Sequence, residues 1–310
     1  VFCHALPEHR GEHDHETISG GLRLMSTPRN LAWRHKKAAC FRIFCIGVTA
    51  FAVLILSLLV YQVSVLGMPW LDAQFLSSFP SRFPEKAGIK SALAGTLWLV
   101  SMTAAIAIPI GVLAAVYLEE YAKPTRLTEL ININIANLAG VPSIVYGILG
   151  LAIFVRFFHL DRSVVSGAMT MSLLILPVII IAAKESIRAV SGALRQAAFA
   201  VGATRWQVIR AHVLPAALPG IMTGVILAIS RSIGETAPLI MIGALTYVAF
   251  VPEGPMDEFT ALPIQIFNWT SRPQEQFHEL ASAGIVVLLV VLLIMNALAV
   301  YIRYRGTRVK

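Results

Sequence analysis

Charged side chains are scarce in this sequence, and their scarcity excludes an ordinary soluble domain. Asp, Glu, Lys and Arg make up 14% of the residues, whereas hydrophobic residues make up 57%. Soluble domains carry charge on about a quarter of their residues, so lipid must cover part of this surface. The net charge of +8 comes from basic residues gathered in short loops between apolar runs. That pattern is typical of membrane proteins and does not indicate nucleic-acid binding.

Reactive groups are also few. Cys3, Cys40 and Cys45 have neither the spacing of a metal site nor the even number expected of disulfides. No glycine-rich loop is followed by the Lys-Ser/Thr pair of a nucleotide site, so ATP hydrolysis would need a partner subunit. An intramembrane enzyme would need a nucleophile and base, or a metal set, at membrane depth. The loop residues His159 and His212 are expected on opposite sides of the membrane, which disfavours that alternative.

The apolar runs predict an all-α membrane protein with six transmembrane helices. About 20 apolar residues cross a bilayer as a helix, and helix satisfies every backbone group within one segment. Two runs are interrupted: the third by Pro142 and two asparagines, and the fifth by Arg231, Glu235 and Pro238. The six runs are 43–66, 93–118, 133–157, 164–183, 218–250 and 281–301.

The segment before the first run is polar and rich in His and Arg. We expect residues 1–40 to form a disordered cytoplasmic tail. Met25, which Ser-Thr-Pro follows, is favoured as the native start, with residues 1–24 translated from upstream.

The distribution of basic residues predicts the orientation. Of the 25 Lys and Arg residues, 18 fall in the two terminal segments and alternate loops, six fall in the other loops, and Arg231 lies inside a run. Because basic residues favour the cytoplasmic side, both termini are expected in the cytoplasm. The loop at 251–279 holds five acidic residues against one Arg, which fits the outer face.

The inner loop at 184–215 is long enough for two short helices. Leu194, Ala197, Ala198 and Val201 share one helical face, and Gly202 suits a helix end. A second helical stretch from residue 205 is expected to end at Leu214-Pro215. The simplest alternative is an amphipathic helix lying at the membrane surface.

This loop resembles the cytoplasmic "EAA" loop of ABC importer permeases, in which a coupling helix docks on the ATPase. The resemblance rests on Gln196-Ala197-Ala198, Gly202 and Leu214-Pro215, in order and spacing. Two positions depart from the family pattern: Gln196 replaces the usual Glu, and His212 replaces an aliphatic residue. The departures affect only the polar details of docking.

The fifth run places charge inside the membrane. Arg231 and Glu235 are four residues apart, so they share a helix face and can pair. In one reading the pair is a structural salt bridge. In the other, Arg231 attracts a translocated anion, Glu235 orients Arg231 or weakens its hold so that the anion can leave, and Ser232 and Thr236 line the path with them. A guanidinium suits phosphate because it offers a planar fork of donors.

Four segments together resemble the phosphate-specific permeases of the PstA type. They are residues 117–121, 138–150, 231–239 and 267–273. The resemblance implies a MetI-like permease core, no catalytic residues and no cofactor of its own. It also implies a homologous second permease, a homodimeric ATPase and a periplasmic phosphate-binding protein, in a bacterial inner membrane. Rival readings are a permease for another oxyanion or small solute, and a channel or secondary transporter, which would need no coupling loop.

The expected division of the chain follows. Residues 41–90 would supply the first helix and a periplasmic loop, 91–305 the permease domain, and 306–310 a cytoplasmic tail. The glycines between Gly140 and Gly150 are expected to form a close-packing face, or alternatively to line the path. Glu119 and Glu120, at an inner membrane boundary, are expected to be solvated.

Overall fold

The computed structural model describes residues 28–244 and 247–308, and these are almost entirely helical. The only β-structure within the described residues is an isolated bridge between Ser163 and Glu258. The chain divides into two units, Val1–Val60 and Tyr61–Lys310, which are described separately. In the part of the chain that the structure describes, five helices are long and apolar enough to cross a membrane, or six if one bent pair counts as a single span.

The first unit consists of most of α1 (Pro28–Gly67), a helix of 40 residues. The expectation of a disordered tail is wrong for residues 28–40, which are helical. Proline is well tolerated at the first helical position, and good helix formers such as Lys36, Lys37, Ala38 and Ala39 follow without a breaker. Residues 1–27, and with them the suggestion of a start at Met25, lie outside the described residues.

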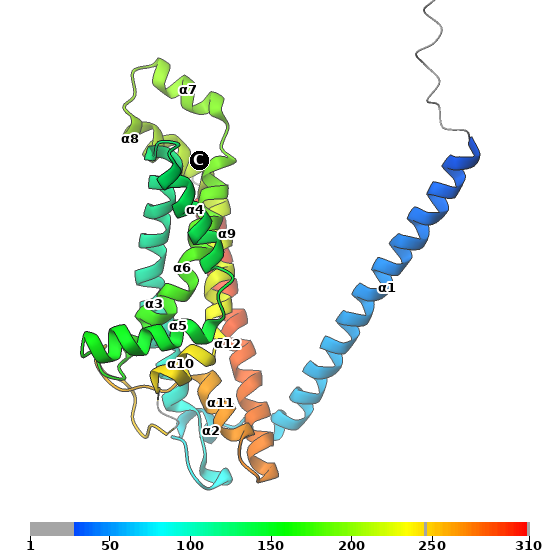
Figure 1. Ribbon diagram of the computed structural model, residues 1–310. Coiled ribbons are helices and arrows are strands. Elements are labelled where there is room, and N and C mark those ends of the chain that lie inside the picture. The colour runs from blue at the N-terminus through cyan, green and yellow to red at the C-terminus, as the bar shows by residue number, and fades with distance from the viewer. Residues whose placement is uncertain (1–27, 245–246, 309–310) are drawn as a thin grey trace, which may run out of the picture. The chain divides into compact units, whose positions relative to one another are not determined.

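The second unit is built on four long helices, α3 (Lys90–Val116), α6 (Val164–Arg188), α9 (Leu214–Ile233) and α12 (Glu275–Arg308) (Figure 1). Small residues let α6 approach its neighbours closely, as is common between membrane helices. Gly111 of α3 packs against Ile179 of α6, and Gly224 of α9 packs against Ala182.

The third expected span is broken into two helices. α4 (Arg126–Leu138) and α5 (Ser143–Gly150), which continues as the π-helical segment η4 (Leu151–Phe157), meet at 104°. A straight helix over 133–157 is therefore wrong. Pro142 caps α5 in an extended conformation, and a proline disfavours helical geometry at the residue before it.

The fifth expected span is also broken. α9 ends at Ile233, and a separate short helix, α10 (Ala237–Ile242), begins after three intervening residues. Pro238 therefore stands in the first turn of α10, where its missing amide hydrogen costs nothing, and not inside a continuous helix.

The segment between α1 and α3 belongs to the second unit, so the expected boundary at residue 90 is wrong. It contains η1 (Met68–Trp70), α2 (Ala73–Ser77) and η2 (Pro84–Lys86). Phe75, Ala87 and Ile89 are buried in one apolar cluster with Trp269 of α11 (Leu262–Thr270) and Phe277 of α12. Burial of these side chains ties the loop to the helices.

At the other end of the unit, α6 is followed by α7 (Gly192–Ala200) and α8 (Arg205–Val208). The helix that starts at Arg205 does not end at Leu214-Pro215. It passes through a π-helical turn, η5 (Ile209–Val213), and continues as α9. A proline cannot donate to the preceding turn and its ring crowds that turn, and the wider π-helical turn accommodates it.

Candidate functional site: a charged pair in a broken span and a coupling loop

Arg231 and Glu235 form the expected ion pair. The Arg231 Nε lies 3.3 Å from the Glu235 Oε1, and the side chains are 55% and 18% exposed. Arg231 stands in the last turn of α9, whereas Glu235 follows the helix end, where Gly234 donates its amide to the Arg231 carbonyl. The pair thus spans the break between α9 and α10, and the arginine is the more accessible partner.

Helix packing indicates the depth of Arg231. α9 and α6 run antiparallel, with Gly220 against Ser186 and Gly224 against Ala182. Continuing this register from Gly224 to Arg231, about 10 Å of helix, brings Arg231 level with Ile175, near the middle of the 25 residues of α6. A charge at such a depth costs about 2.5–3.5 kcal/mol on insertion scales, and such residues face protein or water.

Ser232 and Thr236, the two hydroxyl residues proposed to line the path with the pair, differ in exposure. Ser232 is buried, 4% exposed, and its hydroxyl donates to the Ile229 carbonyl, so it does not share the exposure of Arg231. Thr236 is half-buried, next to Glu235 at the break. Ser230, on the other side of Arg231, donates to the Asn296 side chain of α12 and holds the two helices together.

The two broken spans meet each other. α5 packs on α10, and both lie across the long helices in Figure 1. The expectation of a close-packing face is confirmed for Gly147, which lies against Pro238 and Met241, and for Gly150, which lies against Thr170; a β-carbon on Gly140 would have one ordinary contact. Irregular backbone at membrane depth is tolerated where it is buried in protein or lines a water-filled cavity.

The loop around α7 has the expected turn. Gly202 has φ +83°, its amide donates to the Phe199 carbonyl, and the Ala203 amide donates to the Ala198 carbonyl. This pair of bonds is the Schellman motif, which needs a residue in the left-handed region. Thr204 and Gln207 then cap α8 reciprocally. The chain therefore reverses sharply between α7 and α8.

The proposed coupling residues differ in exposure. Gln196, Ala197 and Gly202 are exposed, Ala198 is buried at 6%, and Leu214 and Pro215 are half-buried at the start of α9.

Larger apolar side chains are also exposed on the loop formed by α7 and α8. Phe199, Val201 and Trp206 are 48%, 85% and 51% exposed. The sequence pattern drew attention to small residues and missed Phe199 and Trp206.

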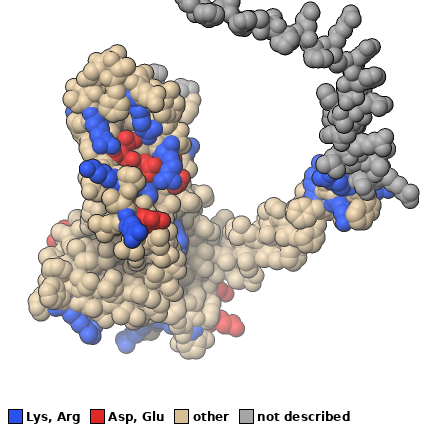
Figure 2. All heavy atoms as spheres, turned by 45° about the horizontal axis from the view of Figure 1, so that its top comes forward, with Lys and Arg blue, Asp and Glu red and all other residues tan. Residues whose placement is uncertain are grey.

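Glu119 and Glu120 are not solvated, contrary to expectation. They lie on η3 (Tyr117–Tyr121), a π-helical segment that continues α3, and their side chains are 17% and 11% exposed. Glu119 pairs with Arg188 at 2.9 Å, and Glu120 pairs with Arg195 at 2.8 Å. Figure 2 shows basic and acidic side chains interleaved at this end of the unit.

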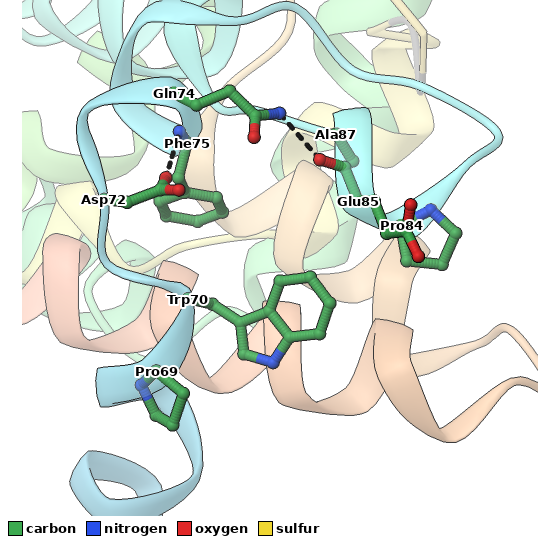
Figure 3. Close-up of a pocket in the computed structure, with 8 residues that line it drawn as sticks. All are labelled: Pro69, Trp70, Asp72, Gln74, Phe75, Pro84, Glu85 and Ala87. Carbon is green, nitrogen blue, oxygen red and sulfur yellow. Dashed lines mark hydrogen bonds between the residues drawn. The ribbon is translucent and has the colours of Figure 1, made fainter.

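A cavity of about 230 Å³ lies at the end that holds α2 (Figure 3). Its polar groups bond within the chain: the Asp72 carboxylate accepts from the Phe75 amide, and the Gln74 amide donates to the Glu85 carbonyl. Its lining includes Asp72 and Glu85 but no Lys or Arg, so it lacks the cationic donors that suit an oxyanion.

Comparison with known proteins finds a family whose model matches most of the chain. The model of the "Binding-protein-dependent transport system inner membrane component" matches residues 107–306. The chain is 31% identical to the phosphate transport system permease protein PstA 1 of Mycobacterium tuberculosis, over 77% of each chain. It is also 31% identical to the probable ABC transporter permease protein YqgI of Bacillus subtilis, over 78% of this chain and 86% of that protein.

A solved structure shares the fold. The match is to the MetNI methionine ABC transporter in an inward-facing conformation, with a TM-score of 0.55 and 17% identity over 71% of this chain and 94% of that one. The expected MetI-like permease fold is therefore confirmed.

Proposed function

The chain belongs to the family of binding-protein-dependent transport system inner membrane components, and we propose that it passes inorganic phosphate into the cytoplasm. Members are non-catalytic, multi-pass membrane subunits of ABC importers, in which a separate subunit hydrolyses ATP. Membership of the family identifies the class of transporter, whereas the cargo and the roles of single residues are proposed.

The observation that carries the proposal is the exposed arginine at mid-membrane depth. Arg231 is bound on one side by Glu235, at 3.3 Å, and leaves about half of its side chain accessible. Its guanidinium can donate two parallel hydrogen bonds to an oxyanion. Glu235 competes for the same guanidinium, so the anion is held weakly enough to leave. Thr236 lines the path at the break, whereas Ser232, which is buried, supports the helix end.

The partners follow from the same proposal. A second homologous permease would cover the exposed face that carries Arg231, and a periplasmic phosphate-binding protein would deliver the anion. A homodimeric ATPase would dock on α7 and α8, where Gln196, Ala197 and Gly202 are exposed. Both termini would then be cytoplasmic, in a bacterial inner membrane, and this chain would bind no cofactor.

Each ATPase cycle would move α7 and rock the long helices between two states. Ala198, Leu214 and Pro215 would hold the loop to the helices, since they are buried or half-buried. Alternating access of this kind opens a fixed midplane site to one side at a time.

Uptake by right-side-out vesicles that contain the whole complex and enclose ATP tests the cargo. Radiolabelled phosphate uptake should depend on ATP and on the binding protein, and excess sulfate or molybdate should not compete. Uptake of another oxyanion in preference to phosphate would instead favour the second candidate, a permease for that anion. Arg231 would serve either anion, so the competition assay, and not the geometry, decides between them.

A further inference from the structure

Three cationic side chains from three successive segments converge on η3. Arg188, the last residue of α6, donates from Nε and Nη2 to the two carboxylate oxygens of Glu119, at 2.9 and 3.1 Å. Arg195 of α7 donates from Nε and Nη2 to Glu120 Oε1, at 3.1 and 2.8 Å. Arg205 of α8 stacks on the Tyr121 ring, with its Cζ 5.1 Å from the ring centroid.

Of these three arginines, Arg195 bonds to the largest number of different residues. Besides Glu120, its Nη1 donates to the Val190 carbonyl at 2.6 Å, and its Nη2 donates to the Ile187 carbonyl at 2.8 Å. Val190 lies just beyond α6 and Ile187 lies in its last turn, where carbonyls lack the usual helical partner, and the guanidinium supplies a donor to each. The Ile187 carbonyl also accepts from the Val190 amide at 3.2 Å. One side chain therefore bonds to the end of α6, to η3 and, through its own backbone, to α7.

The Arg195–Glu120 pair is more deeply buried than an ordinary surface ion pair. The side chains of Arg195 and Glu120 are 21% and 11% exposed, whereas those of Arg188 and Glu185, paired at 3.1 Å, are 55% and 62% exposed. Exposed pairs are screened by water and contribute little. The Arg195–Glu120 pair is largely buried, and each nitrogen of the guanidinium donates at least one hydrogen bond, so this charge-assisted contact is stronger than an exposed pair.

Arg195 bonds to the ends of two helices, α6 and, through η3, α3, which pack closely against each other. η3 directly continues α3, and α3 packs along α6 with Gly111 against Ile179. A displacement of α7 that kept the Arg195 bonds would have to move the ends of α3 and α6 together. Without those bonds, α7 would keep the short turn at 189–191 and the apolar packing of Ala198, but it would lose its hydrogen bonds to η3 and to the end of α6.

We propose that Glu120 and Arg195 are positioning residues that transmit movement of α7 to α3 and α6, and so join ATP hydrolysis to transport. The proposal rests on the proposed function in one respect, since it takes α7 as the helix that the ATPase moves. It assigns a role to a carboxylate 75 residues away in sequence from its arginine partner, outside the loop that carries the family motif.

The test uses the whole complex in proteoliposomes, with its own ATPase and binding protein. Three quantities are measured: ATPase copurified with the chain, the ATPase rate with and without loaded binding protein, and phosphate taken up per ATP hydrolysed. Glu120→Gln removes the charge and keeps the shape. Arg195→Lys keeps the charge but loses the fork that reaches both carbonyls. Glu185→Gln is the matched control, because it makes the same change in an exposed neighbour.

Glu120→Gln and Arg195→Lys should retain the ATPase subunit and at least half of the basal ATPase rate. Uptake per ATP should fall about tenfold or more, and stimulation by the binding protein should be lost. Glu120→Asp should recover part of both, and Glu185→Gln should match the wild type. A merely structural role would lower the yield of complex without changing uptake per ATP in the complexes that form.

Wild-type uptake per ATP in Glu120→Gln and Arg195→Lys would overturn the inference. Loss of the ATPase subunit from both variants would overturn it as well, because the pair would then support assembly and not transmission. Failure of the proposed cargo has a different signature: the wild-type complex would not take up phosphate. Stimulation of the ATPase by the binding protein with a panel of oxyanions would still compare Glu120→Gln with the wild type.

Discussion

Gly147 of α5 lies against the backbone of Pro238 in α10, so closely that a β-carbon at position 147 would stand 2.7 Å from the Pro238 Cα. This contact joins the two broken spans at the level of the charged pair, since Pro238 follows Glu235 by three residues. The position of α10, and with it that of the break beside Arg231, depends on the absence of a side chain at residue 147.

Gly147→Ala should therefore displace α10 and impair transport. Two of the three nearest atoms, the Pro238 Cα and carbonyl oxygen, belong to backbone, and the third is the Met241 Cβ. None is the far end of a flexible side chain that could move aside, so overpacking of about 1–3 kcal/mol is expected. Uptake should fall strongly and the midpoint of thermal unfolding in detergent should drop. Gly140→Ala is the control, because a β-carbon there meets only the Asn137 carbonyl, at an ordinary 3.5 Å. Equal uptake in the two variants would contradict the account.

Arg231→Gln should abolish uptake while the complex still assembles. Glutamine loses the charge and the fork but keeps an amide group that can donate to the Glu235 carboxylate, so Glu235 is not left without a hydrogen-bond donor. Arg231→Lys should retain partial uptake, because a point charge attracts the anion without the bidentate geometry. Copurification of the ATPase checks assembly, and uptake by vesicles checks transport.

Arg126→Gln is the control for loss of positive charge, since Arg126 is an exposed residue at the start of α4. It should transport normally. Normal uptake by Arg231→Gln would leave the pair with Glu235 as a structural salt bridge only.

The transmembrane helices could be predicted because they depend on local composition. Runs of about 20 apolar residues mark the spans, and Pro142 and Pro238 mark the weak points in two of them. The 104° bend between α4 and α5 could not be predicted, because an angle between two helices depends on what each packs against. In this unit α5 packs against α10, which comes from a distant part of the chain.

The same limit applies to the charged residues: a pair close in sequence could be predicted, and pairs distant in sequence could not. Arg231 and Glu235 are four residues apart, so their pairing could be expected from helix geometry alone. Glu119 and Glu120 have partners 69 and 75 residues away, and the spacing of charges along the chain carries no sign of such pairs. Their expected solvation was wrong because two acidic residues at a helix end pair with arginines that only the fold brings near.

The turn after α7 allows a further prediction at one glycine. Gly202 has φ +83°, with nothing within 4 Å of where its β-carbon would be, so a side chain there would meet strain and no collision. Gly202→Ala should cost about 1–2 kcal/mol of left-handed strain and loosen the bonds that close α7. The exposed side chains of α7 would then lose their fixed direction, and less ATPase should copurify at a given salt concentration.

Gly192→Ala provides the matched control at the other end of the same helix. A β-carbon there also has open space, and Gly192 does not have a positive φ, so alanine should favour the helix slightly. The ATPase should copurify with Gly192→Ala as with the wild type and be reduced with Gly202→Ala. If both variants retained the ATPase equally, the direction of α7 would not depend on the turn, and docking would have to rest on α8 and Trp206 alone.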